Sequence, residues 1–355
     1  MTNLDKTCLA AVDADKDELM LSSSGGAFSV LARKVISHGG AVYGHAFDEG
    51  LHVACVRVDS LDGLAALRGS KYVQSDMGDS MSLVRNDLKA GREVLFSGTP
   101  CQVDGLLAFL GGPQDGLLTV DIVCHGVPSQ PFFSDCLKWE FAGSRLDSVR
   151  FRDKREGWGC GGGTTTTTTT PVFHRLVTRD RPFSPEISFY YRRFLSGDVY
   201  RESCYRCPYA GGERPGDFTI GDFWGIDVDD SGLDPSFGIS VIFANTEKAV
   251  ALIPYIKEET AWAERPLEEA IRGNDQLMHP TPRPEARDIV LDRWLEEGID
   301  AVSYTHLDVY KRQRKSGAIT FRKTFAILRR LTLFITVLKF RISRAHLVRV
   351  KTSYF

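Results

Sequence analysis

The stretch "EVLFSGTPCQVDGLLAFL", residues 93–110, contains a strand, a turn and a helix in direct succession. The apolar run at 93–98 is typical of a buried strand, and the turn after it begins a helix. "LLTVDIVCHG", residues 117–126, repeats this design, with Cys and Gly at the carboxyl end of an apolar strand. Strands that alternate with helices predict an α/β fold with a mixed sheet and flanking helices.

The alternation continues on both sides of this stretch. Upstream, the pattern predicts a helix over 22–40, strands over 41–47 and 51–58, and a helix over 81–91. After residue 145 the pattern takes on α+β character, with an edge strand predicted for the Thr run 164–170, a short helix within 187–197, strands within 216–225 and 237–245, and a helix that Asn245 caps. We therefore predict an N-terminal α/β part at 1–145 and a C-terminal part at 146–300.

Composition and charge exclude some classes of function. The 355 residues carry a formal net charge of −2, but residues 314–355 hold eleven Lys or Arg and no acid, which leaves −13 for the rest. An acidic body of this kind argues against nucleic-acid binding. We find neither a signal peptide nor an uncharged apolar run of about 18 residues, so we expect a cytoplasmic protein with reduced thiols.

Four of the eight Cys residues lie in turns beside Gly or Pro, namely Cys101, Cys124, Cys204 and Cys207. The last two form a C-x-x-C pair, and a tetrahedral iron or zinc centre needs four such ligands. Spacing alone leaves three readings open: an iron–sulfur cluster, a structural zinc ion, or a redox dithiol with two unrelated buried thiols. Cys55 and Cys136 are predicted to lie in the core.

Other motifs suit a bound anion or cofactor, although each also has an ordinary explanation. The "SSSGG" run at 22–26 is either an anion site at a helix start or a plain N-cap. "RGSKY" (68–72) and "FRDKREGW" (151–158) could hold an anion, or could be solvated turns. "RPGDFTIGDFWG" (214–225) is either a wall beside a cofactor or a turn with an aromatic plug.

Taken together and in order, the motifs resemble the beta-subunit family of coenzyme F420 hydrogenases and dehydrogenases. The resemblance covers roughly residues 10 to 300 and rests on "SSSGGAFSVLA", "GGAVYGHAF", "LRGSKYVQS", "VLFSGTPCQVDGL", "VDIVCHGVPS", "FRDKREGW", "CYRCPYAGGERPGDFTIGDFWGI" and "NDQLMHPTPRPEARD". So long an ordered set is far more specific than any single motif.

The resemblance implies a flavin- and iron–sulfur-dependent oxidoreductase that passes electrons between a 4Fe–4S cluster, FAD and a small two-electron acceptor, a deazaflavin in archaeal members. It implies that Cys101, Cys124, Cys204 and Cys207 hold the cluster. It also implies a flavin pocket formed by Ser23, Ser24, Gly25, Gly26, Ser70, Lys71, Tyr72, Gly98, Thr99 and Pro100. The alternatives are a non-catalytic electron-transfer subunit that needs a partner enzyme, and a zinc-stapled binding module.

Two departures from the family pattern affect the expected partners. Many members begin with a ferredoxin-like segment, C-x₂-C-x₂-C-x₃-C-P, which this sequence lacks. A second cluster would therefore need either a redox partner protein, such as a ferredoxin or a larger subunit, or a missing upstream region. The Thr run also replaces an ordinary patterned strand.

The last part of the sequence has a different character. "VSYTHLDVYKRQ", residues 302–313, back-translates into an inverted palindrome that resembles two abutted transposase adapter ends, so we interpret it as a sequencing-adapter scar. The basic tail at 314–355 is of doubtful origin. Taken at face value it forms an amphipathic helix that would make peripheral contact with an anionic membrane surface.

Overall fold

A computed structural model describes residues 7–142, 144–154, 157–158, 163–169, 177–183, 188–211 and 213–303. The described residues up to Asp292 form one compact unit, and those from Arg293 belong to a second. The predicted division at residue 145 falls inside the first unit and stays a prediction. The scar and tail lie outside the described residues, apart from the first two residues of the scar.

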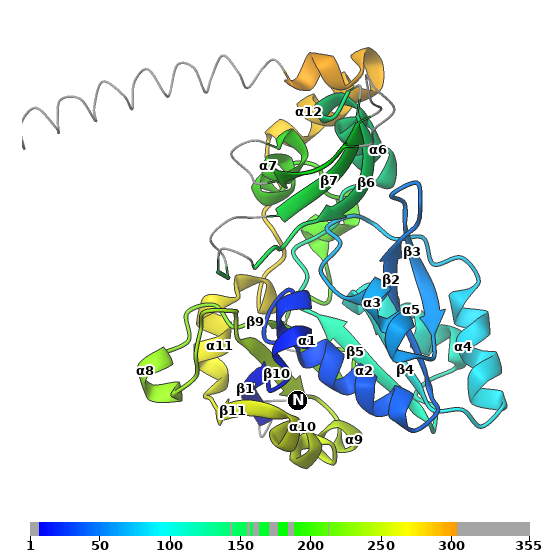
Figure 1. Ribbon diagram of the computed structural model, residues 1–355, viewed down its shortest axis with the longest axis vertical. Coiled ribbons are helices and arrows are strands. Elements are labelled where there is room, and N and C mark those ends of the chain that lie inside the picture. The colour runs from blue at the N-terminus through cyan, green and yellow to red at the C-terminus, as the bar shows by residue number, and fades with distance from the viewer. Residues whose placement is uncertain are drawn as a thin grey trace, which may run out of the picture. The chain divides into compact units, whose positions relative to one another are not determined.

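An eight-stranded mixed sheet dominates the first unit, which confirms the predicted α/β fold (Figure 1). The strand order across this sheet is β11-β1-β10-β9-β5-β4-β2-β3. Strands β2, β4, β5 and β9 run parallel to one another, and the others pair antiparallel with their neighbours. The bounds are β1 Thr7–Asp13, β2 Ala41–Phe47, β3 Val53–Val58, β4 Val94–Gly98, β5 Leu117–Ile122, β9 Phe218–Asp222, β10 Ser240–Ala244 and β11 Thr260–Glu264.

Helices cover both faces of this sheet (Figure 1). One face packs against α2 (Ala27–Ser37), α3 (Leu61–Leu67), α9 (Glu247–Val250) and α10 (Ile253–Glu259). The other packs against α4 (Ser80–Lys89), α5 (Pro100–Leu110), α8 (Val228–Ser231) and α11 (Leu267–Gly273). The remaining helices are α1 Lys16–Leu21, α6 Gln130–Glu140, α7 Phe189–Ser196, η1 Glu202–Arg206, η2 Asp275–Leu277 and α12 Ala286–Glu297.

Because helices cover both faces of the sheet, its central strands contain the apolar runs from which they were predicted. In β4, Leu95 faces one core while Val94 and Phe96 face the other, and all three are fully buried. A strand that is covered on both faces needs apolar side chains at every position, not at alternate ones.

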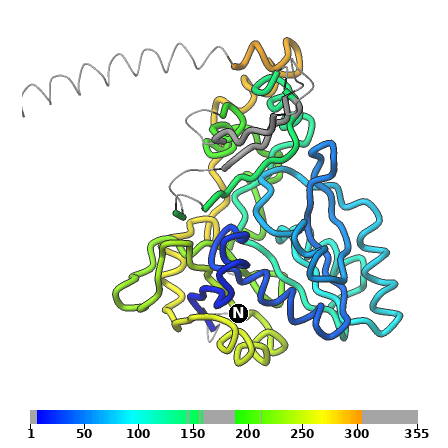
Figure 2. Tube along the Cα trace, in the orientation of Figure 1, coloured from blue at the N-terminus to red at the C-terminus, as the bar shows by residue number. Residues whose placement is uncertain are grey.

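Segments distant in the sequence meet in one half of the sheet. Strand β1 lies between β10 and β11, so Leu9 pairs with Ile242 on one side and with Glu264 on the other. Figure 2 follows this meeting of the blue N-terminal strand with the yellow-green late segments. The half of the sheet that contains β1 is therefore completed only by late residues.

A second sheet has three antiparallel strands in the order β6-β7-β8, with bounds Arg145–Arg150, Gly163–Thr169 and Val177–Phe183. The Thr run forms β7 and pairs on both sides. The prediction of a strand was therefore right, but the prediction of an edge strand was wrong because β8 covers its second side.

Two predicted helix starts also need correction. The helix predicted from residue 22 begins at Ala27, because Gly26 adopts a left-handed conformation with φ 89°. Asn245 does not cap a helix. Thr246 is the cap and accepts a hydrogen bond from the Ala249 N–H, while the Asn245 amide donates to the Gly216 carbonyl and to Thr219. Within the described part of the chain, no helix has the length and apolar character needed to cross a bilayer.

Candidate functional site

A cavity of about 500 Å³ lies at the carboxyl edge of the parallel strands. Its walls come from the segments that end or follow β2, β4, β5 and β9, and from the loops around 22–26 and 67–75. Ligands of open α/β sheets bind at this edge because the loops there are free to vary. The cavity therefore lies where the strand pattern predicted a site.

Cys101 and Cys124 reach this edge from neighbouring strands. Cys101 lies in the first turn of α5, where Thr99 and Gln102 form a capping box. Its exposed thiol shares a hydrogen bond of 3.1 Å with the Thr99 hydroxyl. Cys124 follows β5 by two residues, and both Cys residues line the cavity.

Two tethers bring the C-x-x-C loop to the same place. The Arg201 N–H donates to the Val127 carbonyl at 3.0 Å, which joins the start of this loop to the segment that follows Cys124. On the far side of the loop, the Tyr209 hydroxyl donates to the Asp104 carboxylate at 2.6 Å, next to Cys101 on α5. Cys204 lies within η1 and Cys207 caps its end.

The four thiols are near enough to influence one another electrostatically. The pKa of Cys124 is raised to about 12, chiefly by burial and in smaller part by the charges of Cys204, Cys101 and Cys207, while the Gly126 N–H opposes the shift. Burial also raises the pKa of Cys204, with added contributions from Cys101 and Cys207. The described residues contain no group of three or more His, Cys, Asp or Glu placed to hold a single metal ion.

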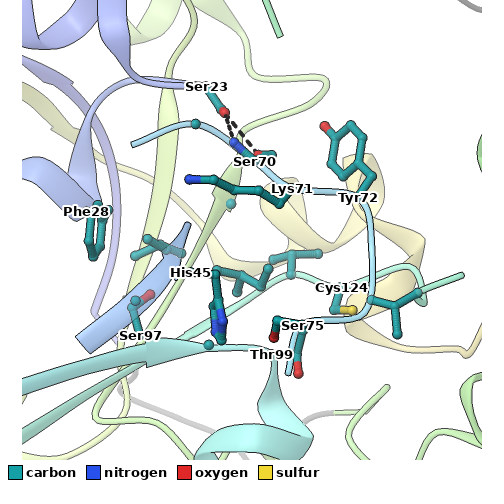
Figure 3. Close-up of a pocket in the computed structure, with 18 of the residues that line it drawn as sticks. Ser23, Phe28, His45, Ser70, Lys71, Tyr72, Ser75, Ser97, Thr99 and Cys124 are labelled. Carbon is teal, nitrogen blue, oxygen red and sulfur yellow. Dashed lines mark hydrogen bonds between the residues drawn. The ribbon is translucent and has the colours of Figure 1, made fainter. Parts of the chain in front are cut away.

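The end of the cavity that holds Cys101 and Cys124 is called the Cys end. The opposite end, called the Ser end, is built from Ser and Lys side chains. The Ser23 hydroxyl accepts hydrogen bonds from the Ser70 N–H at 2.6 Å and from the Ser70 hydroxyl at 3.0 Å (Figure 3). The Ser24 hydroxyl donates to the Ile239 carbonyl. The hydroxyls therefore join two loops and do not cap α2, although the first residues of α2 do line the cavity.

Two glycines allow the loop at residues 22–26, which we call the Ser loop, to pack closely against β1. A Cβ on Gly26 would lie 2.6 Å from the Asp13 Cβ, and one on Gly25 would lie 2.1 Å from the Ala11 carbonyl oxygen. Such approaches are too short for any other residue. Gly25 does not line the cavity itself, but it allows the loop to pack against β1.

Lys71 lines the cavity and donates to three carbonyls at the end of α3. Burial lowers its pKa to about 7.

Tyr72 also lines the cavity, and its ring stacks on Phe194 with centroids 4.4 Å apart. Gly98 and Thr99 line the wall at the end of β4, whereas Pro100 is buried in the first turn of α5 and does not line the cavity.

The "FRDKREGW" segment is not a solvated face where it is described. Lys154 is buried and donates to the carbonyls of Leu19 and Ser24, and the Trp158 indole N–H donates to the Ser23 carbonyl at 3.2 Å. The segment thus hydrogen-bonds to the backbone of the Ser loop and stabilises one wall of the cavity.

Arg152 joins this segment to the end of β9. Its guanidinium lies 3.2 Å from the Asp222 carboxylate and packs over the rings of Trp158 and Trp224. Burial raises the pKa of Asp222, and the Arg152 charge opposes that shift. Asp222 and Trp224 line the cavity. Asp217 has a structural role, because it accepts from the N–H and the hydroxyl of Thr119.

Sequence reasoning missed His45, which lies in β2 and lines the cavity. Its two ring nitrogens are buried and have no hydrogen-bond partner among the residues that the structure describes. The only signal in the sequence was a polar residue near the end of a predicted strand, which is a weak one.

Comparisons with known proteins were made for the whole chain. A family model that describes the C-terminal part of the beta subunit of coenzyme F420 hydrogenase/dehydrogenase matches residues 91–270, about half of the chain. Among solved structures, a chain from the F420-reducing NiFe hydrogenase complex of Methanosarcina barkeri, studied after xenon derivatization, aligns with 16% identity and a TM-score of 0.49. That alignment covers 84% of this chain and 90% of the other. No curated protein matches the chain.

Proposed function

The chain belongs to the coenzyme F420 hydrogenase/dehydrogenase beta-subunit family, and on this premise we propose that it is a flavin- and iron–sulfur-dependent oxidoreductase module. In this proposal electrons pass between a 4Fe–4S cluster, FAD and a small two-electron acceptor. The observation that carries the proposal is the approach of four loop thiols to one end of a cavity whose other end has hydroxyls and a Lys side chain.

The thiols suit an iron–sulfur cluster. Burial and the charges of neighbouring thiols favour the protonated forms of Cys124 and Cys204, so a positively charged centre that binds thiolates would offset this cost. Cys101, Cys124, Cys204 and Cys207 would be the four ligands. The tethers through Arg201 and Tyr209 would hold the C-x-x-C loop at a fixed distance from the other two thiols.

The cavity suits a dinucleotide such as FAD. Lys71 and the amino end of α2 lie on its wall, and both favour a phosphate group. Tyr72 lines the cavity and offers an aromatic ring. When bound, a flavin would supply two-electron chemistry, and a cluster would supply one-electron transfer.

The proposed electron acceptor and partner protein are inferred from the name of the family. The family's name describes a beta subunit of enzymes that use coenzyme F420, which is a deazaflavin, so a deazaflavin-like acceptor and a further subunit or ferredoxin are part of this proposal. Trp224 lines the cavity next to the Arg152–Asp222 ion pair, and its ring suits a planar ligand. A cytoplasmic location also stays a proposal.

Anaerobic purification and reconstitution with iron, sulfide and FAD tests the proposal. We expect about four irons and one flavin per chain, with broad visible absorbance. A chain that binds zinc but neither iron nor flavin would be a zinc-stapled module, contrary to the proposal.

Turnover distinguishes an enzyme from a relay. The chemically reduced, reconstituted chain would be mixed with deazaflavin, nicotinamide and quinone acceptors, and their absorbance followed. Reduction of an acceptor by the isolated chain supports an oxidoreductase. Reduction only after a partner enzyme is added would identify the non-catalytic electron-transfer subunit.

A further inference from the structure

His45 lies on the wall of the cavity, between Lys71 and the segment that holds Ser97 and Thr99 (Figure 3). Residues 41, 43 and 45 share one face of β2, and the first two are fully buried against α4 and α5. A Cβ on Gly98 would lie 3.3 Å from the His45 Nε2, so the ring rests against the backbone at the end of β4. The glycine there leaves the ring the room to reach the cavity.

The two ring nitrogens of His45 lower the stability of the fold unless they form hydrogen bonds. Neither Nδ1 nor Nε2 has a hydrogen-bond partner in the part of the chain that the structure describes, and both are shielded from water by the protein. Buried side-chain nitrogens in folded proteins are nearly always paired, because an unpaired one has lost its hydrogen bonds to water. An apolar residue at position 45 would avoid this cost, so a bound partner is the simplest reason for a histidine.

The ring is neutral at physiological pH. The pKa of His45 is lowered to about 4, chiefly by burial and in smaller part by the charge of Lys71, and the Ser97 backbone opposes the shift without reaching hydrogen-bond geometry. A neutral imidazole offers one donor and one acceptor. Its natural partner is an uncharged group that also has both, and not a phosphate.

The position of the ring narrows the partner further. Figure 3 shows His45 between Lys71, on the Ser side of the cavity, and the segment that holds Ser97 and Thr99, with Cys124 beyond. A flavin whose phosphates lie at the Ser end and whose ring approaches the thiols would place its middle part next to His45. That part carries the ribityl hydroxyls and, beyond them, the lactam edge of the ring.

We propose that His45 is a positioning residue that hydrogen-bonds an uncharged donor–acceptor group of the bound flavin, either a ribityl hydroxyl or the ring lactam. This inference rests on the proposed function. It adds a binding contact that the family motifs did not predict, at the boundary between the phosphate end and the redox end of the cavity.

The test uses the full chain, freed of flavin and titrated with FAD. His45→Leu removes both nitrogens and keeps a similar size, and His45→Gln keeps one donor and one acceptor. His38→Leu is the matched control, since His38 is half-exposed at the end of α2 and does not line the cavity. We expect about 10- to 100-fold weaker FAD binding for His45→Leu, a smaller loss for His45→Gln and no change for His38→Leu.

Thermal unfolding of the flavin-free chain separates binding from structure. Loss of unpaired buried nitrogens should leave the melting temperature of His45→Leu equal to or above that of the wild type. A purely structural histidine would instead lower it, and that result would overturn the inference.

The visible spectrum of bound FAD identifies the partner group. A shifted flavin band or midpoint potential in His45→Gln indicates the ring lactam, and an affinity loss with an unchanged spectrum indicates a ribityl hydroxyl. Equal FAD affinity, spectrum and potential in the wild type and His45→Leu would contradict the inference while the proposed function survives. Failure of the wild type to bind FAD would contradict the proposed function itself.

Discussion

The Ser end and the Cys end of the cavity hold their polar side chains in opposite ways. At the Ser end, Ser23 is hydrogen-bonded to Ser70, and Lys71 is held by three carbonyls. At the Cys end, burial raises the pKa of Cys124 and of Cys204, and the charges of the other loop thiols add to both shifts. The Ser end is thus stabilised by the protein's own contacts, while at the Cys end burial disfavours the thiolates of Cys124 and Cys204, a cost that the proposed cluster would offset.

Removing one thiol tests the Cys end and should have the largest effect. We expect Cys→Ser at any of positions 101, 124, 204 and 207 to abolish the iron–sulfur absorbance and the bound iron, because a cluster needs all four thiolates. Visible spectra and iron and sulfide content under anaerobic conditions measure this. Cys55→Ser and Cys136→Ser are the controls, since neither residue lines the cavity, and both should keep the absorbance. A fully loaded Cys204→Ser chain would remove that residue from the ligand set.

Reversing the charge at the Ser end tests where the phosphates bind. Lys71→Glu places a carboxylate beside a dianionic pyrophosphate, so we expect FAD affinity to fall by about 100-fold. Fluorescence titration measures the affinity. Lys138→Glu provides the control, because this Lys on α6 is 79% exposed and lies outside the cavity lining. Undiminished affinity in Lys71→Glu would move the phosphates to another wall.

A pair of glycines tests whether the Ser end is formed by packing. Gly26→Ala and Gly39→Ala both place a Cβ at positive φ, 89° and 76°, which costs about 1 kcal/mol. Only Gly26 has a neighbour closer than 3 Å to that Cβ, so we expect a further loss of about 1–3 kcal/mol there. Urea unfolding of the flavin-free chain measures both. Equal losses in the two variants would mean that the Ser loop moves aside easily.

The pH dependence of FAD binding should be the smallest effect. Burial lowers the pKa of Lys71 to about 7, so the flavin-free chain loses this positive charge as the pH rises through 7. A bound phosphate favours the charged form, and binding must then take up a proton. We expect FAD affinity to be constant below about pH 6 and about 10-fold weaker at about pH 8. Lys71→Met should bind weakly with no such dependence, and a wild-type chain with constant affinity would show that Lys71 stays charged.

The parts of the fold that sequence predicted are those in which local pattern and packing agree. Strand β4 and helix α5 followed from apolar runs that both faces of the sheet require. The start of α2 did not follow, because Gly26 is positioned by Asp13 on β1, a contact that helical periodicity does not contain. The place of the Thr run within its sheet depended in the same way on a pairing partner that its own residues cannot specify.

Only part of the candidate site could be predicted, because some of its residues gain their role from neighbours that are distant in the sequence. Spacing alone left iron, zinc and a dithiol open for Cys204 and Cys207, and only the ordered motifs joined them to Cys101 and Cys124. The structure places Cys101, Cys124, Ser23, Ser70 and Lys71 on one cavity, while the charges of Cys204 and Cys207 act on Cys124, and the joint role of the four thiols stays a prediction. His45 escaped notice because a polar residue in a strand has meaning only once the neighbours that fail to pair with it are known.

The position of β1 between β10 and β11 has a consequence for biosynthesis. Strand β1 leaves the ribosome early, but its partners begin at Ser240 and Thr260. At roughly 5–20 residues per second, translation needs on the order of ten seconds or more to supply them. During that time Gly25 and Gly26 have β1 beside them but not the sheet that fixes it. The thiols of the C-x-x-C loop emerge in the same interval, so insertion of the proposed cofactors would belong to a late stage of maturation, after β10 and β11 have been made.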